Sequence, residues 1–340
     1  MKKLSSILVG VFVGIWIFNV GCDGNLSNSP SMASDTTLSL EAREWSKKID
    51  ESPSVAEYYL LRGDVLMNED QIELAIKDYK QAIRLNPDNS MHYYKLGDAY
   101  FATDQTTLAL EQYKEAERVD PNDIQAVFKH AQFLYFVRNF SQGSIKFGKL
   151  LTLDPEHAEG CFYNAMLHKE DGDTLRAIQL FKKNLELLGA DYNSSMQLGI
   201  LYENLHDIEQ AINYYQKAIN TDPQSDEAYY ALGLAYQKSS ENALAMENYQ
   251  KAIDVNPKHY LAYYNAGNIL ALNGKYASAI EHFKISLRLK SDLAKSYNRI
   301  GQCFELLESK ENAVENYLKC LEIDPNFALA KEGLDRLGKL

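Results

Sequence analysis

The chain has 340 residues and a formal net charge of −12, and 46% of its residues are hydrophobic. A strongly acidic chain repels the phosphates of nucleic acids, so we exclude nucleic acid as a partner. The four cysteines lack the spacing of a metal-binding motif and the seven histidines form no H-x-x-x-H pair, so we expect no metal and no cofactor. One globular domain of this length would be large, whereas an array of repeats can reach it easily.

Residues 1–21 have the pattern of an export signal. Lys2 and Lys3 precede an almost wholly apolar run from Leu4 to Val20, and this combination is typical of a signal peptide. The run is marginal in length for a membrane-spanning helix. A cleaved signal and an uncleaved signal anchor would both leave the two lysines inside and the rest of the chain outside the cytoplasm.

The signal ends in Val20-Gly21-Cys22, which resembles the lipobox of bacterial lipoproteins, although Asn19 stands where that family prefers leucine. The resemblance implies cleavage before Cys22 and acylation of this cysteine, and several acyl chains together anchor a protein firmly in a membrane. Residues 22–37 are small and polar, so we expect them to form a flexible, lipid-anchored tether. The membrane is therefore an expected partner through the lipid anchor.

Residues 38–55 are expected to cap the array with half of a helical repeat. Leu38 to Ile49 fits one helix, with Trp45 in the position that aromatic residues take in the repeats that follow.

Residues 56–327 contain eight repeats of 34 residues without insertion, the first starting at Ala56. Position 8 is always small: Gly63, Gly97, Ala131, Ala165, Gly199, Gly233, Gly267 and Gly301. Position 24 is always aromatic: Tyr79, Tyr113, Phe147, Phe181, Tyr215, Tyr249, Phe283 and Tyr317. Six of the eight prolines lie at position 32: Pro87, Pro121, Pro155, Pro223, Pro257 and Pro325. We expect two helices per repeat, at positions 1–14 and 17–30, with proline after the second.

This pattern resembles the tetratricopeptide repeat (TPR) family over residues 56–327. The resemblance implies an all-α fold, a right-handed superhelical solenoid of antiparallel helix pairs. A charged C-terminal capping helix at residues 328–340 would close the stack, as repeat arrays require. Repeats 3 and 4 depart most from the pattern, with Leu150 and Asn184 at position 27 and Gly189 in place of proline.

In the TPR family, positions 2, 5, 9, 12 and 13 of each repeat line a concave groove. In repeats 2 to 5 an apolar set at these positions is our predicted partner-binding groove: Tyr94, Phe101, Phe128, Tyr135, Phe136, Phe162, Met166, Met196 and Ile200. A contiguous apolar patch of this size marks an interaction site. The alternative is that a compressed repeat 3 buries Tyr135 and Phe136 in the core.

Repeats 7 and 8 carry a predicted secondary polar groove: Asn265, Asn268, Lys295, Asn298 and Arg299. Asn265, Lys295 and Arg299 resemble part of the carboxylate clamp of chaperone-binding TPR domains. Tyr230 and Leu234 occupy the places of the clamp's other lysine and asparagine. A complete clamp, a looser contact with a carboxylate and a merely solvated end therefore all stay open.

Cys303 and Cys320 are positions 10 and 27 of repeat 8, which face each other across the helix pair in the family. Outside the cytoplasm a disulfide is chemically feasible. We expect two small buried thiols instead, because position 27 requires a small residue.

The sequence contains no nucleophile elbow, phosphate loop or metal cluster, so we expect no enzyme activity. The TPR resemblance implies a non-catalytic scaffold or adaptor in the bacterial cell envelope, which binds a protein or peptide in its concave groove. Comparable envelope-assembly lipoproteins lie mostly in the outer membrane, which we therefore favour. Two alternatives are a self-assembling structural envelope protein and an accessory subunit of an enzyme such as a glycosyltransferase or a protease.

Overall fold

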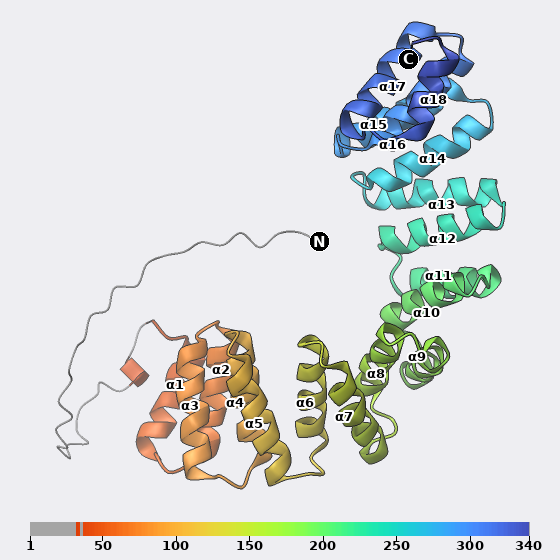
Figure 1. The fold of residues 1–340 in the computed structure, drawn as a ribbon. Helices are drawn as coiled ribbons and strands as arrows, with labels where there is room; N and C mark the ends of the chain where they lie inside the picture. The colour runs from red at the N-terminus through yellow and green to blue at the C-terminus, as the bar shows by residue number, and fades with distance from the viewer. Residues whose placement is uncertain (1–31, 35–36, 340) are drawn as a thin grey trace. The chain divides into compact units, whose positions relative to one another are not determined.

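The computed structural model describes residues 32–34 and 37–339 (Figure 1). The expected signal peptide of residues 1–21 and the expected lipidation site Cys22 lie outside the described residues. Of the expected tether, only a 3-10 helix at Met32–Ser34 and Thr37 are described. No helix in the described ranges combines the length and the apolar character needed to cross a membrane.

The described residues form α-helices and no β-strand, so the predicted all-α solenoid is confirmed (Figure 1). Helix α1 is Leu40–Glu51 and the last helix, α18, is Ala328–Arg336. Between them lie eight helix pairs: α2 (Ala56–Asn68) and α3 (Ile72–Leu85), α4 (Ser90–Ala102) and α5 (Thr106–Val119), α6 (Ile124–Phe136) and α7 (Phe140–Leu153), α8 (Ala158–Glu170) and α9 (Thr174–Leu188), α10 (Tyr192–Asn204) and α11 (Ile208–Thr221), α12 (Asp226–Lys238) and α13 (Asn242–Val255), α14 (Tyr260–Leu272) and α15 (Tyr276–Leu289), and α16 (Ala294–Leu306) and α17 (Lys310–Ile323). Every first helix begins at position 1 of its repeat and every second helix at position 17.

The chain divides into two compact bodies, one ending at Pro87 and the other starting at Asp88. In the first body, α1 packs on α2 and α2 on α3. In the second body, each helix packs on its neighbours along the chain, and the first helices of repeats 2, 3 and 4 also touch one another in series. Contacts between sequence neighbours are the packing pattern of a solenoid.

Within a pair, the missing side chain at position 8 makes room for the aromatic ring at position 24. A Cβ on Gly97 would lie 2.9 Å from the ring of Tyr113, and one on Gly301 would lie 2.7 Å from that of Tyr317. Both rings are almost completely buried. The Tyr113 hydroxyl donates a hydrogen bond to Asp98 on the facing helix at 2.7 Å. Tyr113 therefore fills the space between the two helices and also links them by a hydrogen bond.

The turn inside every pair uses a left-handed backbone at position 15. The residues with positive φ there are Asp70, Asp104, Arg138, Gly172, His206, Ser240, Gly274 and Glu308. Only two of these are glycine, the residue that adopts this conformation without steric cost. The turn geometry is therefore set by the packing of the pair rather than by the residue in the turn.

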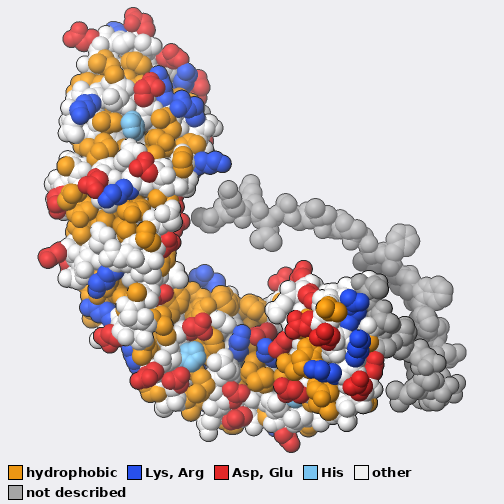
Figure 2. Space-filling model, turned by 180° about the vertical axis from the view of Figure 1, so that it is seen from behind, with side chains coloured by type: hydrophobic (Ala, Val, Ile, Leu, Met, Phe, Trp, Pro, Cys, Tyr) orange, Lys and Arg blue, Asp and Glu red, His pale blue; other side chains and the backbone are white. Residues whose placement is uncertain are grey.

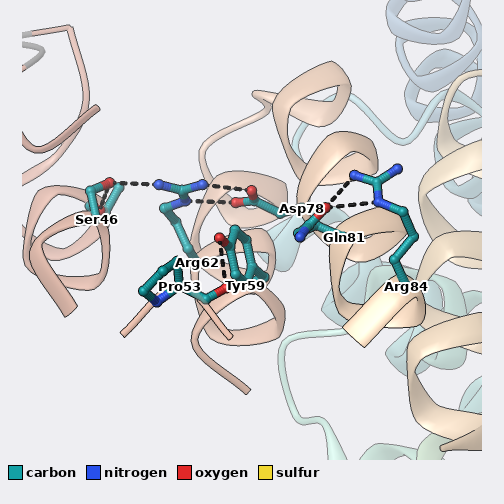
Figure 3. A network of polar contacts seen from close by, with 8 residues as sticks. Ser46, Pro53, Tyr59, Arg62, Asp78, Gln81 and Arg84 are labelled. Atoms are coloured by element: carbon teal, nitrogen blue, oxygen red, sulfur yellow. Dashed lines mark hydrogen bonds and ion pairs between the residues drawn. The ribbon is translucent and has the colours of Figure 1, made fainter. Parts of the chain in front are cut away.

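The first body contains a buried ion pair that corrects one expectation about its cap (Figure 3). Arg62 donates two hydrogen bonds of 2.7 Å to Asp78 and one of 2.9 Å to Ser46 of α1. The expectation that Trp45 takes the aromatic core position is wrong, because the buried residues of α1 are Ala42, Ser46 and Ile49. Trp45 is half-buried, with its ring 6.0 Å from that of Tyr58.

The departures in repeats 3 and 4 are compensated at position 3 of the following repeat. Leu150 is fully buried at position 27, and Gly160 leaves space for it, since a Cβ on Gly160 would lie 2.7 Å from the leucine. Asn184, also at position 27, donates a hydrogen bond of 2.8 Å to Ser194. Helix α9 runs on to Leu188, and Gly189 ends it with a φ of 73° where other repeats end before a proline.

Candidate functional site

Four aromatic side chains from three successive first helices meet on the second body. They are Phe101 of α4, Tyr135 and Phe136 of α6 and Tyr163 of α8, here called the aromatic cluster. The ring of Phe136 lies 6.0 Å from those of Phe101 and Tyr163 and 5.5 Å from that of Tyr135. Phe136 is 50% exposed, whereas its three neighbours are half-buried. The cluster therefore exposes the ring of Phe136 to solvent, packed against three half-buried aromatic rings.

The local structure explains why Phe136 is exposed. It is the last residue of α6, and the chain then turns through Arg138, whose φ is 60°. Phe101 contacts Phe133 edge to face at 5.3 Å, which fixes its ring against α6. Tyr163 packs parallel to the buried Phe147 at 6.1 Å. Rings held in this way lose little conformational entropy when a partner binds.

Two of the predicted groove residues lie in the core instead of on the surface. Tyr94 is 6% exposed and Phe128 is 4% exposed. The ring of Phe128 contacts those of Phe147 at 6.5 Å and His157 at 4.8 Å. At this burial neither Tyr94 nor Phe128 offers a surface to a partner, and both contribute to packing.

The other four apolar groove residues flank the hydrophobic core and do not join the aromatic cluster. Phe162 and Met166 pack against the core between repeats 4 and 5, and Met196 and Ile200 pack against the next core region. All four are half-buried. Of the predicted apolar set, the structure thus brings together Phe101, Tyr135 and Phe136.

The alternative in which repeat 3 buries both Tyr135 and Phe136 holds only partly, and only for Tyr135. Tyr135 packs against the core of repeat 3, whereas Phe136 remains exposed. Tyr163, at position 6, was missed by the sequence analysis. It is the only aromatic residue at position 6 among the eight repeats, and this departure was a usable signal.

A buried polar group lies between α5, α6 and α7 of the same body. The carboxylate of Glu117, 9% exposed, lies 2.6 Å from the His130 imidazole and accepts hydrogen bonds from Lys146 at 2.8 Å and Lys149 at 3.2 Å. Burial opposes ionisation of Glu117, but the hydrogen bonds and charges of His130 and Lys146 outweigh it and lower its pKa to about 2. The His130 ring stacks on Tyr113 at 6.3 Å, so this polar group braces α6 against the preceding repeat.

Sequence profiles of one repeat family match most of the helix pairs. Profiles described as TPR repeat match residues 63–104 and 202–240, and profiles described as tetratricopeptide repeat match residues 93–123, 230–294 and 294–327. The chain belongs to the tetratricopeptide repeat family. TPR arrays are in general non-catalytic scaffolds for protein interaction.

Solved TPR structures resemble this chain in fold. A TPR repeat-containing protein of Cytophaga hutchinsonii is 18% identical, with 71% of this chain and 99% of that chain covered and a TM-score of 0.62. PilF of Pseudomonas aeruginosa is 16% identical, with coverage of 63% and 97% and a TM-score of 0.53. YrrB, described as a TPR protein with an unusual peptide-binding site, is 23% identical, with coverage of 56% and 97% and a TM-score of 0.50. No curated protein matches the chain in sequence.

The polar groove of TPR repeats 7 and 8 is only partly assembled. Asn268 and Arg299 line one cavity of about 240 Å³, together with Leu272 and Gln302. Asn265 is buried and donates a hydrogen bond of 3.1 Å to Tyr230, the residue that stands where a clamp lysine would be.

The other two residues of this groove take part in packing. Asn298 is 2% exposed, and the Lys295 ammonium lies 4.2 Å above the ring of Tyr264. The structure therefore brings Asn268 and Arg299 together at one cavity. Asn265, Lys295 and Asn298 pack against neighbouring side chains instead.

The cysteines of TPR repeat 8 are buried free thiols, so Cys303 and Cys320 form no disulfide in this structure. Burial raises the pKa of both thiols to about 11, which keeps them protonated and unreactive at neutral pH. Cys161 is likewise free and buried. Among the described residues, no group of His, Cys, Asp and Glu side chains has a geometry that suits a metal ion.

Proposed function

We propose that this TPR protein is a non-catalytic scaffold of the bacterial cell envelope that binds a protein or peptide through the aromatic cluster. The observation that carries the proposal is the exposed ring of Phe136, held between Phe101, Tyr135 and Tyr163. Aromatic residues of this kind supply most of the binding energy at protein interfaces.

The surface around the cluster fits a binding role better than a catalytic one. Acidic, basic and hydrophobic side chains are interspersed over the face in Figure 2. Single exposed apolar residues are normal on any protein, but four aromatic rings drawn from three helices form a contiguous apolar surface. The exposed Arg138 and Glu170, whose charges act on Tyr135, would contribute to the polar rim of an interface.

The proposed anchor is an acylated Cys22 in the outer membrane, with residues 23–37 between the anchor and the helices. The support is the signal-like sequence before Cys22 and the polar composition after it. Such an anchor would hold the binding surface outside the cytoplasm, close to partners in the envelope.

The binding proposal is tested by placing a photo-crosslinking amino acid at position 136 of the full chain in cells. We expect a discrete adduct with one envelope protein. The matched control is position 318 on α17, where Leu318 is 48% exposed and is not a member of the aromatic cluster. Equal adducts at both positions would contradict the proposed site, and an adduct with a second copy of this chain would favour the self-assembling alternative.

The anchor is tested separately by Cys22→Ser. We expect this variant to lose labelling by a radioactive fatty acid and to leave the membrane fraction or remain unprocessed. Unchanged processing and sedimentation with membranes would show that Cys22 is not the lipidation site, without bearing on the aromatic cluster.

A further inference from the structure

A cavity of about 560 Å³ lies between α9 and α11, the second helices of TPR repeats 4 and 5. Ser195 of the first helix α10 also lines it, and none of these three helices carries a residue of the aromatic cluster. Its lining includes Lys182, Leu185, Tyr214, Lys217 and the buried Ser195. This volume is within the range of small-molecule sites.

Three residues that depart from the repeat pattern line this cavity. Ser195 stands at position 4, where five other repeats carry a tyrosine. Gly189 and Ala190 also line the cavity, in the segment where other repeats have their proline. Small side chains at these points leave space that a tyrosine ring and a proline ring would otherwise reduce.

Lys182, Lys217 and the buried Tyr214 line the cavity, and the Tyr214 ring stacks on Tyr202, which is not part of the lining. The rings of Tyr202 and Tyr214 are parallel at 5.5 Å, with an interplanar angle of 5°. The Lys182 ammonium lies 5.4 Å from the Tyr202 ring, and the Lys217 ammonium lies 4.7 Å from the Tyr214 ring. A hydrogen bond to the Tyr202 hydroxyl raises the pKa of Lys182, so its charge is retained at neutral pH.

Neither ammonium group forms an ion pair with a carboxylate in the described part of the chain. Glu186 lines the same cavity, but its carboxylate is not within ion-pair distance of either lysine. The partners of Lys182 and Lys217 are neutral tyrosines, so both positive charges are left uncompensated in a protein of net charge −12.

A second cavity provides an internal comparison. It has a volume of about 510 Å³ and lies at the same repeat positions between α15 and α17. There Lys284 is paired with Glu281 at 3.0 Å, and Lys319 is paired with Glu315. Tyr297 lines it at position 4, where the first cavity has its serine.

The difference between the two cavities is encoded at position 22. Repeats 7 and 8 place Glu281 and Glu315 there, one turn before the lysines. Repeats 4 and 5 have the uncharged Gln179 and Asn213 at the same position. The lysines of the first cavity thus lack the carboxylate partners that the corresponding lysines have at the second.

We propose that the cavity between α9 and α11 binds a small organic anion, with its acidic group between Lys182 and Lys217 and an apolar body against Leu185. Charge-assisted hydrogen bonds from two ammonium groups favour a phosphate or a carboxylate. Leu185 is half-buried in the cavity lining and offers a contact surface to the apolar body. This site does not depend on the aromatic cluster or on the anchor.

The test is calorimetric titration of the full chain with phenyl phosphate, inorganic phosphate and phenol. We expect phenyl phosphate to bind more tightly than inorganic phosphate, which lacks the body, or phenol, which lacks the charge. Lys182→Gln with Lys217→Gln should weaken phenyl phosphate binding at least about tenfold, since about 1.4 kcal/mol corresponds to one decade. Lys284→Gln with Lys319→Gln, at the second cavity, is the matched control and should leave the affinity unchanged.

A second variant keeps both lysines and removes only their free charge. Gln179→Glu with Asn213→Glu reproduces the lysine pairing of the second cavity, and we expect a loss of affinity comparable to that of the lysine variant. Equal weakening by both lysine pairs, unaltered binding to the glutamate variant, or inorganic phosphate binding as tightly as phenyl phosphate would each overturn the proposal. Melting curves of all variants separate loss of binding from loss of fold.

Discussion

Glu117 shows how single residues in this array couple one repeat to the next. It lies in the last turn of the second helix of repeat 2 and contacts His130 and Lys146, which belong to the two helices of repeat 3. A buried carboxylate is costly unless it is paired and hydrogen-bonded. Here the partners lower its pKa to about 2 from an ordinary 4.5, so the ionised form stabilises the fold.

This lowered pKa predicts how stability depends on pH. A carboxylate whose pKa falls on folding contributes fully above about pH 4.5 and loses this contribution as the pH falls toward 2. Glu117→Gln should therefore reduce the free energy of unfolding at pH 7 by up to about 3 kcal/mol, and the difference from the native chain should shrink as the pH is lowered. Urea denaturation at a series of pH values measures it.

The control for this prediction lies on the same helix. Glu115 is exposed and pairs with Arg118 at 2.7 Å, and exposed pairs contribute little because solvent screens them. Glu115→Gln should change stability only slightly at every pH. Similar losses for both variants, or a Glu117→Gln loss that persists unchanged at low pH, would show that the polar group does not act through this carboxylate.

At the residue scale, the sequence predicted the repeat positions well and the exposure of individual side chains less well. The small residue at position 8 and the ring at position 24 follow from the period alone. Phe128 was placed in the groove by its repeat position, but the ring of His157 from the next loop covers it. The pairing of Leu150 with Gly160 was readable in principle, because a large residue at position 27 requires a small one ten residues later.

At the scale of the helix pair, the left-handed backbone conformation at position 15 is the feature that the sequence does not predict. Only Gly172 and Gly274 carry the residue typical of this conformation, yet all eight repeats adopt it. The period imposes the same turn on Arg138 and Ser240 because both flanking helices are fixed by their packing. Non-glycine residues in this conformation cost on the order of 1 kcal/mol each.

Two glycine replacements should therefore have opposite effects. Gly274→Ala should destabilise the chain by about 1 kcal/mol, because φ is 73° there and alanine is strained at that angle. Gly148→Ala should stabilise it by about 0.5–1 kcal/mol, because Gly148 lies inside α7 with nothing near the position of a new Cβ. Urea denaturation of both variants measures the difference, and effects of the same sign would contradict this explanation of the turn.

In the helix before repeat 1, the 34-residue period no longer predicts which side chains are buried. Helix α1 has no complete repeat before it, so nothing fixed which face it buries. The repeat position gave Trp45 the place of the buried ring, but Arg62 requires a polar acceptor. Ser46 supplies that acceptor, and Trp45 is half-buried beside Tyr58. A buried arginine at position 7, where most repeats are apolar, was the signal for this shift.

At the scale of the whole molecule, the chain is a series of helix pairs whose contacts are local along the sequence, and it divides into two bodies after Pro87. The sequence predicted the fold class and the family, because eight unbroken periods leave little freedom. It predicted part of the candidate site, since Phe101, Tyr135 and Phe136 come together. The rest depended on which rings the neighbouring repeats cover, and a one-dimensional pattern does not contain that information.

The most direct test of the scaffold proposal is the affinity of the crosslinked envelope protein for the purified full chain and its variants. Phe136→Ala should weaken binding at least about tenfold, because a central aromatic anchor typically contributes about 2 kcal/mol or more. Leu318→Ala, an equally exposed control on α17, should leave the affinity unchanged, and both variants should melt like the native chain. An affinity that is unaltered by Phe136→Ala, or lowered equally by both replacements, would contradict binding through the aromatic cluster.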